Sequence, residues 1–186
     1  MTYIFSIVFL SFITLFSPVF AASFEIDYTK SSISFSGTHA GNAFDGKFEN
    51  WTANITFDPE NLDASSIQAN FETSSAKTGN SLYDGTLPQA DWFDAKNHPK
   101  AEFQSTKITS QPDGTFQIDG TLTLRKISKP VSFKFSLTDF KASPVTAKAN
   151  FTLNRFDYDI GKKSDPKAEW VSKEIVLTLN IIANKK

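Results

Sequence analysis

Few side chains in this 186-residue sequence have catalytic or metal-binding potential. It has two histidines, His39 and His98, and no cysteine, so the usual closed zinc sites cannot form without carboxylate ligands. Asp91 and Asp94 flank an aromatic pair and could act as paired acids, although aspartates at a helix end more often cap it. The sequence contains no H-E-x-x-H, C-x-x-C or phosphate-binding glycine loop. It therefore predicts no metal site and no enzyme.

Two other side chains could bind a polar group. His39 follows the first block of strand-like sequence, where a lone histidine serves either as a hydrogen-bonded structural residue or as a ligand contact. Arg155 follows an apolar run. It could anchor a polar headgroup by charge-assisted hydrogen bonds, or it could pair with Asp157 or Asp159. Both alternatives stay open for each residue.

The charge balance argues against nucleic acid as a partner. The chain has 19 basic and 20 acidic side chains, and its longest basic run is Lys185-Lys186. Proteins that bind nucleic acid need a concentrated basic surface to neutralise phosphates. We expect no nucleic-acid partner.

The N-terminus has the features of an export signal. Residues 4–16 form an uncharged apolar segment, Pro18 ends it, and Val19-x-Ala21 fits the specificity of a signal peptidase. A transmembrane anchor, the alternative, needs roughly 20 apolar residues. We predict a signal peptide at residues 1–21 and one mature domain at residues 22–186, which is periplasmic or secreted.

The positions of these residues depend on strands, because apolar residues recur at every second position. Such alternation is typical of strands with one buried face. Turn sequences separate the blocks, and their short lengths favour antiparallel neighbours. The eight predicted strand blocks include residues 33–35, 51–57, 67–71, 101–103, 116–124, 131–137, 145–153 and 175–181.

Two architectures can bury eight apolar faces. One is a β-sandwich, and the other is an eight-stranded barrel whose interior can hold a ligand. The alternation does not choose between them. Many phenylalanines fall on the inward positions, which favours a barrel with internal space, although a filled core remains open.

A long segment, residues 73–99, breaks the alternation. Long connections in compact domains are often functional. Leu87–Phe93 is predicted to form a short helix with Thr86 as its N-cap, and it would lay Leu87, Trp92 and Phe93 across one end of a barrel.

An ordered set of motifs connects the sequence to a known family. They are Ser31-x-Ile33-x-Phe35, His39-x-Gly41, Gly46-x-Phe48, Ile55-x-Phe57-Asp58-Pro59, Ser74-x-x-x-Thr78-Gly79, Leu87-x-x-x-x-Trp92-Phe93-Asp94, His98-Pro99-x-Ala101-x-Phe103, Gly120-x-Leu122-Thr123-Leu124 and Lys129-Pro130-Val131. Together they resemble the YceI-like family of exported polyisoprenoid-binding proteins, over roughly residues 24–182.

This resemblance implies a fold and a function. The fold is all-β, an extended eight-stranded antiparallel lipocalin-like barrel. The function is non-catalytic binding of an isoprenoid lipid, a quinone or a polyprenyl chain, with no cofactor beyond that lipid. A membrane b-type cytochrome is an implied partner. Many relatives carry a basic residue just before Asp84, where this chain has Tyr83, which favours an uncharged quinone over a phosphate-headed lipid.

The predicted ligand contacts combine inward aromatic residues, the cap and the two polar candidates. Phe48 is out of phase with Trp51, so a bulge near Glu49-Asn50 or one outward-facing side chain is expected.

The oligomeric state stays open, with a dimer as one option. The rivals are a ligand-free β-sandwich that acts as an interaction or stress-response protein, and a lipid-modifying enzyme that uses His39. The predicted contact residues are Phe35, His39, Phe48, Trp51, Phe57, Phe71, Trp92, Phe93, Phe103, Leu122, Phe133, Phe151 and Arg155.

Overall fold

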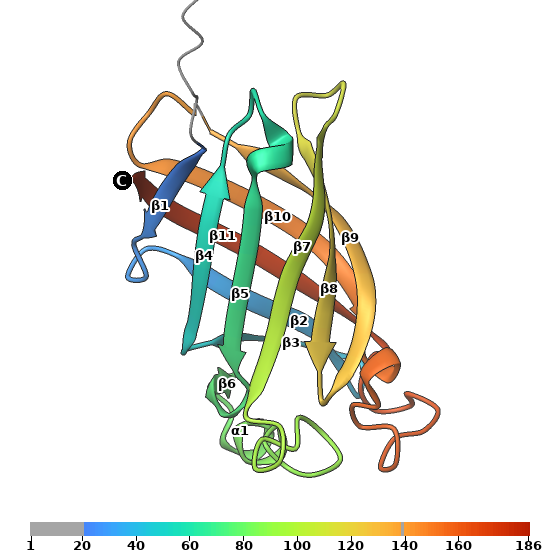
Figure 1. Ribbon diagram of the computed structural model, residues 1–186. Coiled ribbons are helices and arrows are strands. Elements are labelled where there is room, and N and C mark those ends of the chain that lie inside the picture. Colours follow the sequence, from blue (N-terminus) through green and yellow to red (C-terminus); the bar gives the residue numbers. More distant parts are fainter. Residues whose placement is uncertain (1–20, 139) are drawn as a thin grey trace, which may run out of the picture.

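The computed structural model describes residues 21–138 and 140–186, so the predicted signal peptide lies outside the described residues except for Ala21. The regular structure of the described chain is almost entirely antiparallel sheet (Figure 1). Its strands are β1 Ala22–Ile26, β2 Ser32–His39, β3 Asn42–Phe48, β4 Trp51–Phe57, β5 Ser66–Glu72, β6 Ala76–Lys77, β7 Lys100–Ser110, β8 Phe116–Leu124, β9 Ile127–Leu137, β10 Val145–Asn154 and β11 Glu174–Lys185. One α-helix, α1 Ser81–Thr86, and the 3-10 turns η1 Leu62–Ala64, η2 Thr73–Ser75 and η3 Arg155–Tyr158 complete the described elements.

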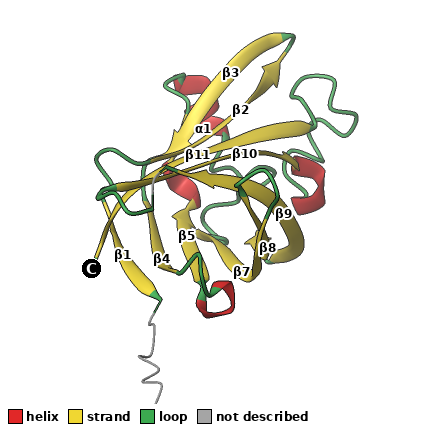
Figure 2. Ribbon diagram, turned by 90° about the horizontal axis from the view of Figure 1, so that it is seen from above, coloured by secondary structure: helices red, strands yellow, loops and turns green. Residues whose placement is uncertain are grey.

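Eight of the strands close into a barrel. They follow the order β1-β4-β5-β7-β8-β9-β10-β11, and β11 pairs back with β1 through Phe24 opposite Lys185 and Ile26 opposite Ala183. Figure 2 shows these strands from above, with β4, β5, β7, β8 and β9 across from β10 and β11. Closure removes the free edges that an open sheet would expose. The predicted eight-stranded antiparallel barrel is confirmed, and the sandwich is excluded.

The eight strands of the ring are not the same set as the eight strand blocks predicted from the sequence. The alternation identified β2 but missed β1, β3 and β6. In the structure β1 closes the ring, while β2 pairs with residues 176–180 of β11 and continues the sheet into β3 and β6. The pattern of β3 is hard to recognise because Gly46 occupies one inward position between Phe44 and Phe48.

Phe48 and Trp51 are out of phase in the alternation because they belong to two different strands. β3 ends at Phe48 and β4 begins at Trp51, with a bend at Glu49-Asn50. Ser75 holds the bend, because its carbonyl accepts from the Glu49 N–H at 3.0 Å and its Oγ accepts from the Asn50 N–H at 3.0 Å. Both aromatic side chains can therefore point inward.

The helix prediction at Leu87–Phe93 is wrong in position. The helix is Ser81–Thr86, and its N-cap is Asn80, whose Oδ1 accepts from the Leu82 N–H at 3.0 Å. Pro88 has no N–H to donate, so a regular helix cannot continue through it. Leu87–Phe93 instead folds into turns, held by the Phe93 N–H donating to the Leu87 carbonyl at 2.9 Å. Among the described residues, none of the helical segments is both long and apolar enough to cross a membrane.

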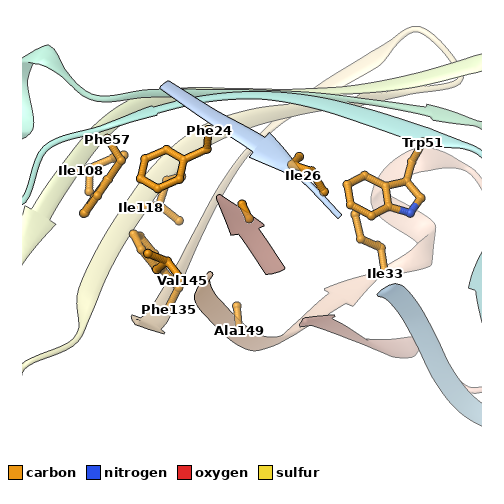
Figure 3. Packing of buried hydrophobic residues seen from close by; sticks show 11 residues of the cluster. Phe24, Ile26, Ile33, Trp51, Phe57, Ile108, Ile118, Phe135, Val145 and Ala149 are labelled. Atoms are coloured by element: carbon orange, nitrogen blue, oxygen red, sulfur yellow. The ribbon is translucent and has the colours of Figure 1, made fainter. Parts of the chain in front are cut away.

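The buried side chains form two clusters along the barrel. The first lies toward β1 and the C-terminus and includes Phe24, Phe57 and Val145 (Figure 3). The second lies toward α1 and the loops at the other end and includes Phe35, Phe93 and Tyr158. The space between the inward faces of these clusters is the candidate site.

Candidate ligand-binding cavity

A cavity of about 270 Å³ runs through the barrel between the two clusters. Side chains from both ends border it, from Phe24 and Val145 to Phe93 and Tyr158. An apolar cavity of about 150 Å³ can already hold benzene. The barrel interior is therefore hollow enough for part of a hydrocarbon ligand.

Most of the predicted contact residues border this cavity. Inward positions of different strands bring most of them together, as the period-two pattern requires, whereas Trp92 and Phe93 come from turns and Arg155 comes from η3. The predicted residues that line the cavity are Phe35, Phe48, Phe57, Phe71, Trp92, Phe93, Phe103, Leu122, Phe133, Phe151 and Arg155.

The cavity wall is almost wholly apolar. Among the lining side chains of the described chain, only Trp92, Lys148, Arg155 and Tyr158 carry a polar group. Water in such a space lacks the two to four polar partners that it needs, so the cavity favours an apolar occupant.

Two glycines shape the wall by leaving room for aromatic rings. Gly46 lies opposite Phe35 in the β2–β3 pairing, and a Cβ at Gly46 would overlap the Phe35 ring. A Cβ at Gly120 would likewise overlap the Phe103 ring on β7. Each ring therefore lies flat across the neighbouring strand.

The turns of the Leu87–Phe93 segment belong to one end of this cavity. Phe93 is 8% exposed and packs against Phe48, with ring centroids 6.0 Å apart. Trp92 and Leu87 also line the cavity. The adjacent aromatics that interrupt the alternation thus close the barrel from one end.

Arg155 forms a buried ion pair that sequence analysis missed. Its partner is Asp165 at 2.7 Å, so an ion pair is present, but with neither Asp157 nor Asp159, the partners that the second of the two open alternatives named. The guanidinium also donates from Nη1 to the Ile160 carbonyl at 2.7 Å and from Nε to the Ser172 carbonyl at 3.1 Å. Only 3% of Arg155 is exposed, and most of its donors are used within the protein.

The electrostatics of this pair follow from burial and hydrogen bonding. Burial lowers the pKa of Arg155, and the Asp165 charge opposes that effect. For Asp165, burial acts to raise the pKa. N–H groups of Val171, Trp170 and Glu169, together with the Arg155 charge, outweigh it and hold the pKa below its ordinary value. The pair is therefore ionised, and it holds the loop at residues 159–173 against η3.

The aspartates beside the aromatic pair have separate structural partners. The Asp91 carboxylate accepts from the Ser164 N–H at 2.7 Å and the Ser164 hydroxyl at 2.6 Å. Asp94 lies 3.5 Å from Nε2 of His98. Asp91 thus ties the Leu87–Phe93 segment to the 159–173 loop.

Two predicted contact residues lie outside the cavity lining. His39 ends β2, and its Nδ1 is 2.9 Å from the hydroxyl of Tyr83 on α1. Trp51 lies beside Ile26 and Ile33 in the first cluster (Figure 3). It packs against the ring of Tyr28, with centroids 4.9 Å apart. Both side chains are engaged in holding neighbouring segments together.

Sequence analysis also missed Tyr158, which lines the cavity. Tyr158 is only 2% exposed, and its hydroxyl has no hydrogen-bond partner among the described residues. Burial, reinforced by the charge of Asp157, raises the pKa of Tyr158 to about 12. Tyr158 lies in η3, after the end of β10, so no strand periodicity could have placed it.

A closed antiparallel barrel around an apolar interior defines the class of lipocalin-like barrel proteins. The YceI-like domain model matches residues 24–183, and the chain belongs to this family. It is 30% identical over 148 residues to a UPF0312 protein of Pseudomonas putida strain W619, which covers 75% of this chain and 77% of the relative.

Solved structures share the fold. The crystal structure of BcnA from Burkholderia cenocepacia has a TM-score of 0.80 at 22% identity and covers 85% of this chain and 99% of that one. A polyisoprenoid-binding domain from Saccharophagus degradans, implicated in plant cell wall breakdown, has a TM-score of 0.69 at 12% identity. That match covers 89% of this chain and 99% of the domain. At these identities the likeness concerns the fold.

Proposed function

We propose that this protein is an exported, non-catalytic carrier that holds an isoprenoid lipid inside its barrel. The apolar cavity, continuous between the two buried clusters, is the observation that carries the proposal. The similarity in fold to a polyisoprenoid-binding domain supports it. The proposed location is the periplasm or the medium, on the basis of the apolar N-terminal segment.

The energetics suit a carrier. Burying hydrocarbon is worth about 0.8 kcal/mol per methylene relative to water. A membrane gives the chain almost the same environment as an apolar cavity, so transfer between them changes the free energy little. Such a protein can take a lipid from one membrane and release it to another.

The charge of the cavity wall favours an uncharged head. Arg155 is neutralised by Asp165, and Lys148 is the other cation among the lining residues of the described chain. A phosphate head would need more compensation than this wall offers. A quinone is therefore the preferred ligand, and a membrane b-type cytochrome that exchanges quinone is the proposed partner.

Extraction of the purified protein tests the proposal. The protein should be expressed with residues 1–21, recovered from the exported fraction and extracted with organic solvent for mass spectrometry. We expect a mature chain that begins at Ala22 and an isoprenoid lipid in the extract. An empty extract, combined with no binding of added ubiquinone, would contradict the carrier function.

The enzyme alternative makes a different prediction. A lipid-modifying activity that uses His39 would disappear in His39→Ala. His39 is engaged with Tyr83 outside the cavity lining, so we expect His39→Ala to loosen α1 and to keep lipid binding. Lipid content and any turnover, measured on the same sample, separate the two.

A further inference from the structure

The strands β9 and β10 are joined over only part of their lengths. The ladder connects residues 147–149 of β10 with residues 135–137 of β9. On their other sides β10 pairs with β11 over residues 145–154, and β9 pairs with β8 over residues 127–135. The facing edges of residues 127–134 and 150–154 therefore carry no ladder hydrogen bonds within the described chain. Along this stretch the barrel wall lacks a backbone ladder between β9 and β10.

A second hollow, of about 200 Å³, lies in this gap. It is bordered by residues 129–132 of β9, residues 151–154 of β10, and Asp157 and Tyr158 of η3. η3 follows β10 and packs against β9, which limits the gap at that end (Figure 2). The residues that border both this hollow and the main cavity are Val131, Phe151, Leu153 and Tyr158. Only the side chains of these residues separate the second hollow from the main cavity, because no backbone ladder joins β9 and β10 there.

An aromatic pair stands where the ladder stops. If the register of the paired part continued, Phe133 would lie opposite Phe151. Their rings stack with centroids 4.1 Å apart and planes at 6°. Two stacked rings can separate by side-chain rotation without breaking backbone hydrogen bonds. The wall is therefore easier to open here than along its laddered seams.

Tyr158 borders both the gap and the main cavity, so its hydroxyl is the candidate polar anchor. It is buried without a hydrogen-bond partner among the described residues, which is unfavourable until a ligand supplies one. A tyrosine hydroxyl keeps its proton at neutral pH, so it can donate a hydrogen bond to a ligand. The charged side chains that border the gap are Lys129 and Asp157, one of each sign. An uncharged, oxygen-bearing group fits this composition.

We propose, on the basis of the carrier function, that the gap between β9 and β10 is a lateral portal that holds the polar head of the lipid. The chain enters the barrel past Phe133 and Phe151. The Tyr158 hydroxyl donates a hydrogen bond to an oxygen of the head, which is a hydroxyl or a quinone carbonyl.

Removing one hydroxyl tests the anchor. Tyr158→Phe and the control Tyr28→Phe are titrated with geranylgeraniol and with the hydrocarbon that lacks its hydroxyl group. We expect Tyr158→Phe to weaken geranylgeraniol binding about five- to tenfold, the effect of one hydrogen bond, and to leave hydrocarbon binding unchanged. Tyr28→Phe should bind both as the natural protein does. Unchanged geranylgeraniol binding, or an equal loss for both probes, overturns the anchor. If the natural protein binds neither probe, the carrier function falls as well.

Linking the strands tests the portal. The chain has no cysteine, and Ser132 and Thr152 are exposed on the two edges, so Ser132→Cys/Thr152→Cys can be joined by a bismaleimide. Release of preloaded ubiquinone to vesicles should be at least about tenfold slower than in the same variant capped with N-ethylmaleimide. The control is Asn150→Cys/Thr178→Cys, which links β10 to β11 at exposed positions where these strands are already laddered, and it should not alter release. Equal release rates for the linked and capped forms of the gap variant overturn the portal.

Discussion

At the scale of single residues, the shape of the cavity depends on where side chains are absent as well as on where they are present. Gly120 and Gly46 let the rings of Phe103 and Phe35 lie across neighbouring strands. At the end of the barrel, Arg155 and Asp165 form an ion pair with side chains only 2% and 6% exposed. Each of these features has a measurable consequence.

We predict that Gly120→Ala destabilises the protein by about 1–3 kcal/mol, the usual cost of overpacking. A Cβ there would overlap the Phe103 ring and the backbone carbonyl of Gln104. Gly85→Ala is the matched control, because no atom lies near a Cβ at Gly85 and the residue is inside α1. Helix propensity predicts that the control is neutral or more stable. Urea unfolding measures both, and an equally stable Gly120→Ala would contradict the close packing.

Asp165→Asn should cost about 3–5 kcal/mol at neutral pH, because it leaves the Arg155 charge buried and unpaired. The natural protein should also lose stability in acid. The folded pKa of Asp165 is below its ordinary value of 3.8, so its ionisation contributes fully above that value. The contribution is lost as the pH falls through the lowered folded pKa.

The measurement is urea unfolding of both proteins between about pH 7 and pH 2.5. Asp165→Asn should lack this part of the acid dependence, whereas Asp63→Asn, at an exposed position in η1, should retain it. Parallel pH curves for the natural protein and Asp165→Asn would show that Asp165 is not the titrating group.

At the scale of elements, two irregular segments close one end of the barrel and hold each other. The Leu87–Phe93 turns contribute Trp92 and Phe93, and Asp91 bonds to residues 163 and 164 of the following loop. Arg125 donates to the Ala90 carbonyl at 3.0 Å and also to the Asp159 carbonyl, so it joins the same two segments. The closure is therefore a packed part of the fold.

Phe93→Ala should destabilise the protein by about 3–5 kcal/mol, as expected for truncation of a buried phenylalanine. Trp92→Ala should cost less, because Trp92 is only partly buried. Leu82→Ala on α1 is the control, since Leu82 is 70% exposed and should shift the free energy of unfolding by at most about 0.5 kcal/mol. A Phe93→Ala variant as stable as Leu82→Ala would place the segment outside the core.

At the scale of the whole molecule, closure of the barrel leaves apolar faces that do not fill the space between them. The ring of eight strands buries one face of each, and large aromatic side chains border the remaining hollow. A filled core and a hollow one respond oppositely to added volume.

Ala149→Phe adds volume at a position that lines the cavity. We expect it to fold with little loss of stability and to bind a shorter isoprenoid chain or none. Ala76→Phe is the matched control, because Ala76 is 1% exposed and does not line the cavity, so it should lose at least about 1–3 kcal/mol by overpacking. Thermal unfolding and bound-lipid content are measured together. An equal loss of stability in both variants would indicate a filled interior.

The sequence by itself determined the class of fold and most of the cavity wall. Period-two alternation assigns each strand residue to the inner or outer face, so Phe57, Phe103 and Phe133 could be placed inside before any partner strand was known. Where the alternation was short or interrupted, as in β1 and at Gly46 in β3, it did not identify the strand.

The tertiary structure decided what depends on contacts between distant segments. Asp165 is ten residues from Arg155, in a loop without periodicity, and only folding brings its carboxylate to the guanidinium. Tyr158 lies beyond the end of β10, and the incomplete ladder between β9 and β10 depends on how far the strands diverge. Periodicity encodes which face a residue occupies. The partners of a loop residue and the extent of a ladder follow from packing of the whole barrel, so they could not be read from any local pattern.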